Sequence, residues 1–265
     1  MRIGEDGSGA GGSATVLAFD TSTAAFAASI VKDGALVDSV VSFAERNHSV
    51  RVLSEIQELL RRNGLTGGDL DAIVAGRGPG SYTGVRIAVT AAKTLAWAWN
   101  KPLIGVSSLE ALALGAWLSL RRNHEDLADD RDVWIVPIMD ARRGQVYTAR
   151  YAAGHSPEWR TLDADGIRMI GEWAGRIEDE GTKDDRAAAV WFVGDLELHR
   201  EAIARAEQAG IRLRVHACAM DPCAIGLLGE FKFRSGHRDN VHAFVPNYTQ
   251  LAEAEAKLLA AKRGE

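Results

Sequence analysis

The sequence is poor in the residue types that build metal sites and disulfide frameworks. Its 265 residues include only two cysteines, Cys218 and Cys223, and seven histidines. The spacing of the cysteines is not a usual zinc spacing, and no second pair exists to complete a tetrahedral site. The histidines form neither an H-x-x-x-H nor an H-E-x-x-H pair, so no metal site is predicted. Because low cysteine usage suits a reducing cytosol, we expect a cytoplasmic protein with both cysteines packed as small apolar side chains.

The chain also lacks an excess of positive charge and any long apolar run. Its formal net charge is -5, whereas a protein that grips a nucleic-acid backbone by itself is usually basic. No stretch approaches the roughly 18 apolar residues that a membrane span requires, so no membrane contact is expected. The opening MRIGEDGSGAGGSA has no apolar core of a signal peptide and predicts a flexible tail over residues 1–14, with the fold beginning near Thr15.

Local patterns predict two runs of alternating strands and helices. Short apolar segments bounded by turn residues indicate strands, and apolar residues three and four apart indicate helices. In the first run we expect strands over 15–20, 26–43 (folded back at Asp33-Gly34), 70–76 and 102–108, and helices over 49–62, 85–99 and 109–120. In the second run we expect strands over 133–151, 189–195 and 211–217, and helices over 198–208, 221–235 and 247–263. The charged segment 121–132 predicts a boundary between the runs, and 152–187 is expected to be irregular.

Two segments of the chain share one plan. In VLAFDTSTAAFAASIV a buried strand ends at Asp20, and a strand resumes after a short turn. In WIVPIMDARRGQVYTARY the same plan surrounds Asp140, with the strand resuming at Gln145. This repetition indicates two related halves, although any hairpin with an aspartate in its turn produces the same pattern.

The segment GRGPGSYTGVR, residues 76–86, raises the question of phosphate binding. The P-loop template fails because the segment has no lysine, and the dinucleotide template fails because Thr83 stands where its third glycine should be. Glycines and hydroxyl groups before a helix N-terminus still suit an anion, but a tight strand-to-helix turn explains the same residues. Arg86 opposes the helix dipole, so we expect either a ligand or Asp20 beside it.

The two helices of the first run are rich in apolar residues. Helix 49–62 has one apolar stripe, whereas helix 85–99 is apolar nearly all round. Both could simply cover their own sheet, but the missing polar face of the second helix favours a partner interface. The residues predicted to form this interface are Val52, Leu53, Ile56, Leu60, Val85, Ala88, Val89, Ala92 and Leu95.

Several segments together resemble the TsaB family, the bacterial partner proteins in the synthesis of threonylcarbamoyladenosine at position 37 of tRNAs that read ANN codons. They are VLAFDTST, RNHSVRVLSEIQELL, GPGSYTGVRIAVTAAKTLA, GVSSLEALA, MDARRGQVY and PNYTQLAEAEA. The resemblance is dense from about residue 15 to 115. The chain departs from the family at Thr249-Gln250, where Leu-Arg is more usual.

The resemblance implies an α/β fold of two related actin-like ATPase (ribonuclease H-like) halves, each a mixed sheet flanked by helices. On this basis we expect a tail over 1–14, an N-terminal actin-like ATPase domain over 15–118, a linker over 119–132, a truncated C-terminal domain over 133–247 and a C-terminal helix over 248–265. Asp20 and Asp140 would occupy the two phosphate loops. The residues expected to contact a nucleotide or phosphate are Asp20, Ser22, Gly78, Gly80, Ser81, Thr83, Gly84 and Asp140.

The resemblance also implies a division of labour with TsaD, the catalytic threonylcarbamoyl transferase. Ser108 and Leu112 stand where TsaD has its two metal-binding histidines, and leucine cannot ligate a metal. The expectation is therefore a non-catalytic subunit that pairs with TsaD through helices 49–62 and 85–99, acts with TsaE, and meets tRNA only through the complex. It would have no cofactor of its own, with ATP or ADP left open for the assembled complex, and it could form a homodimer alone.

Two other functions remain open on the sequence. One is an independent ATPase or small-molecule kinase of the same fold, in which Asp20 would bind magnesium-phosphate and Asp140 would act in the second loop. The other is a homodimeric binding module with no role in modification. The glycine segment is then interpreted mainly as the tight joint that begins the partner-facing helix.

Overall fold

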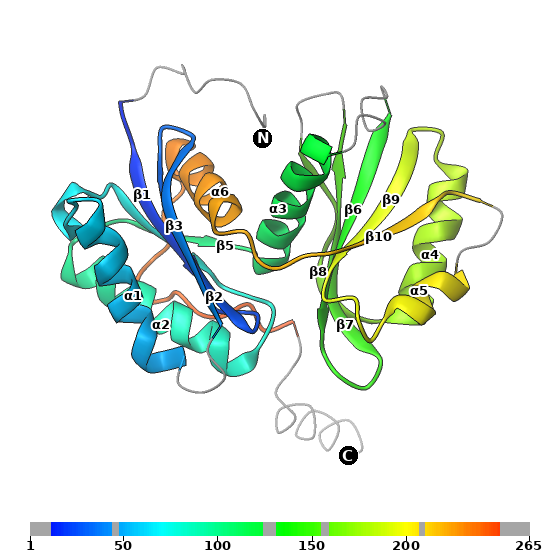
Figure 1. Ribbon diagram of the computed structural model, residues 1–265, viewed down its shortest axis with the longest axis horizontal. Helices are drawn as coiled ribbons and strands as arrows, with labels where there is room; N and C mark the ends of the chain where they lie inside the picture. Colours follow the sequence, from blue (N-terminus) through cyan, green and yellow to red (C-terminus); the bar gives the residue numbers. More distant parts are fainter. Residues whose placement is uncertain (1–11, 44–47, 124–130, 155–158, 207–209, 250–265) are drawn as a thin grey trace, which may run out of the picture.

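A computed structural model describes residues 12–43, 48–123, 131–154, 159–206 and 210–249 of the chain (Figure 1). Two five-stranded mixed sheets form the framework. The first has the order β3-β2-β1-β4-β5, with β1 (Thr15–Asp20), β2 (Ala25–Lys32), β3 (Ala35–Phe43), β4 (Ala72–Gly76) and β5 (Leu103–Val106). The second has the order β8-β7-β6-β9-β10, with β6 (Asp132–Asp140), β7 (Gln145–Ala153), β8 (Arg160–Met169), β9 (Ala187–Gly194) and β10 (Leu213–Ala217).

The two sheets have the same connectivity. In each, the first three strands are antiparallel neighbours and the fourth and fifth are parallel to the first. Among the described residues, each sheet is accompanied by three helices at matching places in the chain. They are α1 (His48–Arg62), α2 (Tyr82–Ala98) and α3 (Ser108–Asn123) in the first half, and α4 (Ile170–Lys183), α5 (Arg200–Ala206) and α6 (Pro222–Arg234) in the second; a short 3-10 helix, η1 (Gly67–Asp69), follows α1. The predicted pair of related halves, built around Asp20 and Asp140, is confirmed.

The third helix of each half packs against the sheet of the other half. Helix α6 lies on the first sheet, and α3 lies on the second (Figure 1). Two glycines of α6 permit the first contact, because a Cβ on Gly226 would overlap Val31 and a Cβ on Gly229 would overlap Val74. The expected C-terminal domain over 133–247 includes α6, although α6 packs on the first sheet. The expected linker over 119–132 overlaps the last turns of α3.

In the described part of the chain, three apolar clusters hold these layers together. One lies between the sheets and includes side chains from α3, α6 and both sheets. The second lies beneath α1 and α2 on the outer face of the first sheet, and the third lies beneath α4 and α5 on the outer face of the second. Because the middle cluster draws on both halves, the two sheets share one core.

The expectation of an irregular segment over 152–187 is wrong. This segment contains all of β8 and all of α4. The sequence of this segment looks polar because β8 lies at the edge of the sheet and has few buried residues. The charged side chains of β8 and α4 form ion pairs. Arg150 pairs with Asp163 at 2.6 Å and with Glu180 at 2.7 Å, and Arg176 joins the same carboxylates.

The remaining helix limits differ from the expectations in smaller ways. Helix α2 begins at Tyr82, three residues before the predicted start, because the Ser81 side chain caps it by accepting from the Gly84 N–H. The hairpin turn is as predicted, with positive φ at Asp33 and Gly34. The helix predicted over 247–263 falls mainly on residues outside the described ranges. Across the described ranges, no helix is both long and apolar enough to cross a membrane.

Candidate functional site: two loop regions and a helical face

The carboxylate of Asp20 is enclosed at the end of β1. Its side chain is 0% exposed, and both oxygens accept hydrogen bonds from neighbouring side chains. Ser22 donates from its backbone N–H and its hydroxyl to Oδ1 at 2.6 Å each, and Ser108 donates to Oδ2 at 2.5 Å. Burial raises the pKa of Asp20, and the hydrogen bonds from Ser108 and Ser22 oppose that rise. Asp20 therefore ties the first turn to helix α3 and does not face an open site.

The glycine segment packs directly on the turn that follows Asp20. The Ser81 N–H donates to the Ser22 carbonyl at 2.8 Å, and the Thr21 hydroxyl donates to the Gly84 carbonyl at 2.6 Å. A Cβ on Gly84 would overlap the Thr21 carbonyl, and a Cβ on Gly80 would overlap Ser22. These glycines allow two backbones to touch. The glycine loop and the turn after Asp20 are therefore in direct backbone contact.

The residues expected to contact a phosphate thus differ in their exposure to solvent. Ser22, Gly78 and Gly84 are buried with Asp20, Gly80 is half-buried, and Ser81 and Thr83 are exposed at the start of α2. Gly78 also belongs to the joint, because its N–H donates to the Ser108 hydroxyl at 3.0 Å.

The expected pairing of Arg86 with Asp20 is wrong. Arg86 points outward, where its Nε donates to the Tyr248 hydroxyl at 2.9 Å and its guanidinium lies 4.1 Å from the centroid of the Tyr82 ring. Asp20 is sealed beneath the glycine loop and out of reach. The sequence did not predict that Tyr82 and Tyr248 contact Arg86 together, because the two tyrosines are 166 residues apart.

Ser108 and Leu112, which the family resemblance aligns with the metal-binding histidines of TsaD, make structural contacts in this chain. Ser108 is fully buried and bridges Asp20 and the Gly78 N–H. Leu112 is buried in the cluster between the sheets. No group of three or more His, Cys, Asp or Glu side chains that could hold a metal ion occurs within the described ranges.

Most of the predicted interface residues lie in the chain's own core. Eight of the nine, all except Leu53, are at most 9% exposed and pack beneath α1 and α2 on the first sheet; they are Val52, Ile56, Leu60, Val85, Ala88, Val89, Ala92 and Leu95. These eight cannot form a partner-facing surface in this fold, because helix α2 hides its apolar stripe against the sheet. The exposed side of the helix pair instead presents Leu53, 44% exposed, and Trp97, 73% exposed, with polar residues around them.

Asp140, at the end of β6, lies in an open pocket, unlike Asp20. Its Oδ1 is 3.1 Å from Nε2 of His199, a buried side chain that precedes α5. The pocket has a volume of about 540 Å³ and is also lined by Arg142, Arg143 and Arg205. The sequence pointed to Asp140 alone; the neighbouring arginines are placed around it by the β6–β7 turn and by α5.

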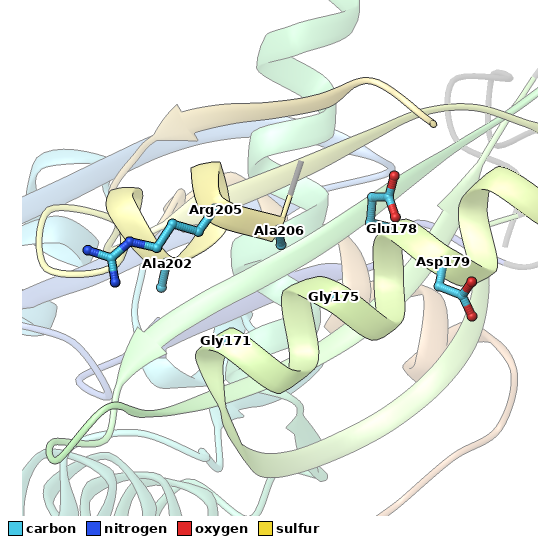
Figure 2. Close-up of a pocket in the computed structure, with 7 residues that line it drawn as sticks. All are labelled: Gly171, Gly175, Glu178, Asp179, Ala202, Arg205 and Ala206. Carbon is cyan, nitrogen blue, oxygen red and sulfur yellow. The ribbon is translucent and has the colours of Figure 1, made fainter. Parts of the chain in front are cut away.

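A second hollow lies between α4 and α5 (Figure 2). It has a volume of about 340 Å³, and small residues of the two helices line it, including Gly171, Gly175, Ala202 and Ala206. The carboxylates of Glu178 and Asp179 point away from the space between the glycines and alanines (Figure 2). This hollow offers no arrangement of acid, base and nucleophile.

Polar side chains join the two halves beside α3. Asp165 on β8 accepts from the Ser107 hydroxyl at 3.0 Å, from the Tyr151 hydroxyl at 3.3 Å and from the Asn247 side-chain amide at 3.0 Å. Burial raises the pKa of Asp165 above its ordinary value, and it likewise raises the pKa of Glu110 nearby on α3. This cluster fixes the second sheet and the C-terminal segment to the start of α3.

The repeated strand order, the crossed third helices and the two strand-end aspartates define a protein of the duplicated ribonuclease H-like, actin-like ATPase fold. Such a fold does not by itself specify a function. The family model described as TsaD, tRNA N6-adenosine threonylcarbamoyltransferase, matches residues 40–258.

Individual relatives are more specific. The chain is 34% identical over 253 residues to the tRNA threonylcarbamoyladenosine biosynthesis protein TsaB of Bacillus subtilis, covering 94% of this chain and 100% of that protein. The Escherichia coli protein of the same name is 33% identical over 169 residues, covering 60% of this chain and 68% of that protein. The solved structure of YeaZ from Pseudomonas aeruginosa superposes with a TM-score of 0.69 at 27% identity, covering 89% of this chain and 99% of that one. The chain belongs to the TsaB family of tRNA threonylcarbamoyladenosine biosynthesis proteins.

Proposed function

We propose that this protein is a non-catalytic scaffold that activates TsaD in the transfer of the threonylcarbamoyl group to adenosine 37 of tRNAs that read ANN codons, and that it acts with TsaE. Membership of the TsaB family supports the pathway, and the match of the TsaD family model over residues 40–258 supports a paralogue of the transferase. A subunit that lacks the catalytic groups can still raise activity if it binds the competent state of its partner better than other states.

The observation that carries the proposal is the closed Asp20 site. An independent ATPase or kinase of this fold would need Asp20 to reach magnesium-phosphate, but here both carboxylate oxygens are engaged by Ser22 and Ser108. The residue at the second metal position, Leu112, lies in the core. These two features support a subunit with no nucleotide or metal of its own. Calorimetry with ATP and magnesium tests this point, because tight one-to-one binding by the isolated chain would favour the kinase.

The partner surface is the exposed side of α1 and α2. Leu53 and Trp97 are large apolar side chains left open on this pair of helices, which lies at one end of the molecule (Figure 1). Tryptophan is among the residue types that contribute most to binding at protein interfaces, and Leu53 adds apolar area to the same pair of helices. The same side could pair two copies of this chain when TsaD is absent.

Reconstitution tests the scaffold role. Purified TsaD and TsaE are supplied with threonylcarbamoyl adenylate and an unmodified tRNA, with and without this chain, and modified adenosine is measured. We expect modification to depend on the chain. Equal modification in its absence would refute the proposal.

A matched pair of variants tests the surface. Leu53→Glu places a charge on the proposed face, whereas Phe231→Glu places one on α6 at the same exposure, 44% in each case. We expect the first variant to lose the TsaD complex in light scattering and the second to keep it, with both showing a wild-type circular dichroism spectrum. If both variants retain the complex, the face is wrongly assigned; a homodimer that survives Leu53→Glu would exclude the same face for self-association.

A further inference from the structure

The β6–β7 turn has a backbone conformation that its residues do not favour. Arg142, Arg143 and Gly144 have φ values of 66°, 55° and 73°. The left-handed region is readily adopted by glycine and by asparagine or aspartate, but not by arginine. The β2–β3 turn meets the same demand with Asp33 and Gly34, at 52° and 78°. The backbone conformation of the turn therefore does not explain why arginine occupies positions 142 and 143. We look for the explanation in the contacts that their side chains can make.

Neither arginine has a counter-ion within the described residues. Both are exposed, and neither guanidinium makes an ion pair or hydrogen bond with another described residue. The two carboxylates of the pocket are already engaged. Asp140 lies 3.1 Å from His199, and Glu201 pairs with Arg205 at 3.0 Å. Two positive charges are thus left over at the mouth of the pocket, on a chain whose net charge is -5.

The turn also presents backbone donors beside these charges. Its hydrogen bonds run from the Ala141 N–H to the Gln145 carbonyl and from the Gln145 N–H to the Arg142 carbonyl, both at 2.9 Å. The N–H groups of Arg142, Arg143 and Gly144 have no acceptor among the described residues. Successive N–H groups in turn conformations make concave sites for anions, and arginine forks suit phosphate oxygens.

We propose that this turn and the adjoining pocket bind backbone phosphates of RNA. The pocket, at about 540 Å³, has room for a phosphate and its sugar, and the exposed Leu198 at its edge offers an apolar contact to the ribose. The choice of RNA over another anion rests on the proposed function, in which the assembly acts on tRNA. The pocket belongs to the half of the molecule opposite α1 and α2, so TsaD and RNA would contact different surfaces (Figure 1).

The test compares two double variants of the full chain. In Arg142→Asn with Arg143→Asn, the new residues suit left-handed φ and keep the turn. The control is Arg121→Asn with Arg122→Asn. It removes two exposed arginines that are adjacent in sequence, as in the test variant, but lie at the end of α3. Binding of a labelled, unmodified tRNA transcript is followed by fluorescence anisotropy across a salt series, with the chain alone and mixed with TsaD, and ATP and inorganic phosphate are added as competitors.

Each phosphate contact contributes about 0.9 to the slope of log K against log salt. We expect the Arg142/Arg143 variant to lower this slope by about 2, so that wild type loses roughly 10-fold more affinity than the variant between about 50 and 200 mM salt, while the control matches wild type. An unchanged slope, or no RNA binding at about 50 mM salt, would overturn the proposal. So would loss of ATP or phosphate binding in the variant with RNA binding intact, which would assign the site to a free anion. Light scattering with TsaD on the same samples reports failure of the scaffold role separately.

Discussion

Replacing Gly84 by alanine tests whether the glycine loop is a close-packed joint. Alanine is the best helix former, so Gly→Ala in an open helical position normally stabilises a protein by about 0.5–1 kcal/mol. Gly84 lies in the first turn of α2, but a Cβ there would overlap the backbone carbonyl of Thr21. Because a carbonyl in a strand-end turn cannot rotate away like a side chain, α2 or the turn must shift.

The size of the effect follows from what that shift disrupts. Forcing an extra methyl group into a packed contact costs about 1–3 kcal/mol. The shift also strains the hydrogen bonds from Thr21 to Gly84 and from Ser81 to Ser22, worth about 1 kcal/mol each. Helix propensity returns about 1 kcal/mol. The net expectation is a loss of about 2–4 kcal/mol, or a fall in Tm of about 5–15 °C.

The control is Gly175→Ala in the middle of α4. A Cβ at Gly175 meets nothing within 4 Å, and the residue faces the hollow between α4 and α5 (Figure 2). We expect this variant to gain about 0.5–1 kcal/mol. Urea unfolding followed by circular dichroism measures both variants. The reasoning is refuted if Gly84→Ala is as stable as wild type, since a loop open enough to hold a phosphate would accept the methyl group.

Three further expectations concern single groups. Ser108→Ala removes a donor to the buried Asp20 carboxylate, and urea unfolding should show a loss of about 2–3 kcal/mol; a loss below about 1 kcal/mol would contradict the bridging role. Burial holds the folded-state pKa of Glu110 above its unfolded value, so its contribution to stability falls as pH rises from the unfolded towards the folded pKa. Glu110→Gln should therefore gain stability relative to wild type as the pH rises above about 4, the ordinary pKa of glutamate, and a pH-independent difference would exclude this. Burial raises the pKa of Cys218 and of Cys223 to about 11, so both thiols should react slowly with a disulfide reagent at about pH 8 and rapidly in urea; fast reaction of the folded protein would show that they are open.

The sequence predicted most strands and helices, because their local signals are strong. The Asp33-Gly34 turn, the buried strand over 70–76 and the apolar stripe of α1 all lie where expected. The failures lie where local polarity misleads. Strand β8 and helix α4 were missed because their charged side chains pair with one another and because α4 contains three glycines, which lower helix propensity.

The candidate sites were predicted less completely than the fold. The glycine segment over 76–86 pointed equally to a phosphate-binding loop and to a tight turn, and the contacts of Gly80 and Gly84 with the chain favour the turn. The apolar excess of α2 was attributed to a partner, but residues such as Ala88 and Ala92 are packed against the chain's own sheet. Periodicity shows that a helix face is apolar, and it does not say what covers that face.

The sequence by itself determined the composition class, the alternation of strands and helices and the repeated strand–aspartate–turn plan, because each is encoded by neighbouring residues. The tertiary structure alone decided which repeated aspartate is sealed and which is open. Asp20 is closed by Ser22, two residues away, and by Ser108, which is 88 residues away, whereas Asp140 opens onto arginines from its own turn and from α5. The tertiary structure also decided that α3 packs on the second sheet and α6 on the first. In the cluster between the sheets, small residues of one half contact apolar residues of the other half. Such contacts join residues far apart in the chain, and no local pattern records them.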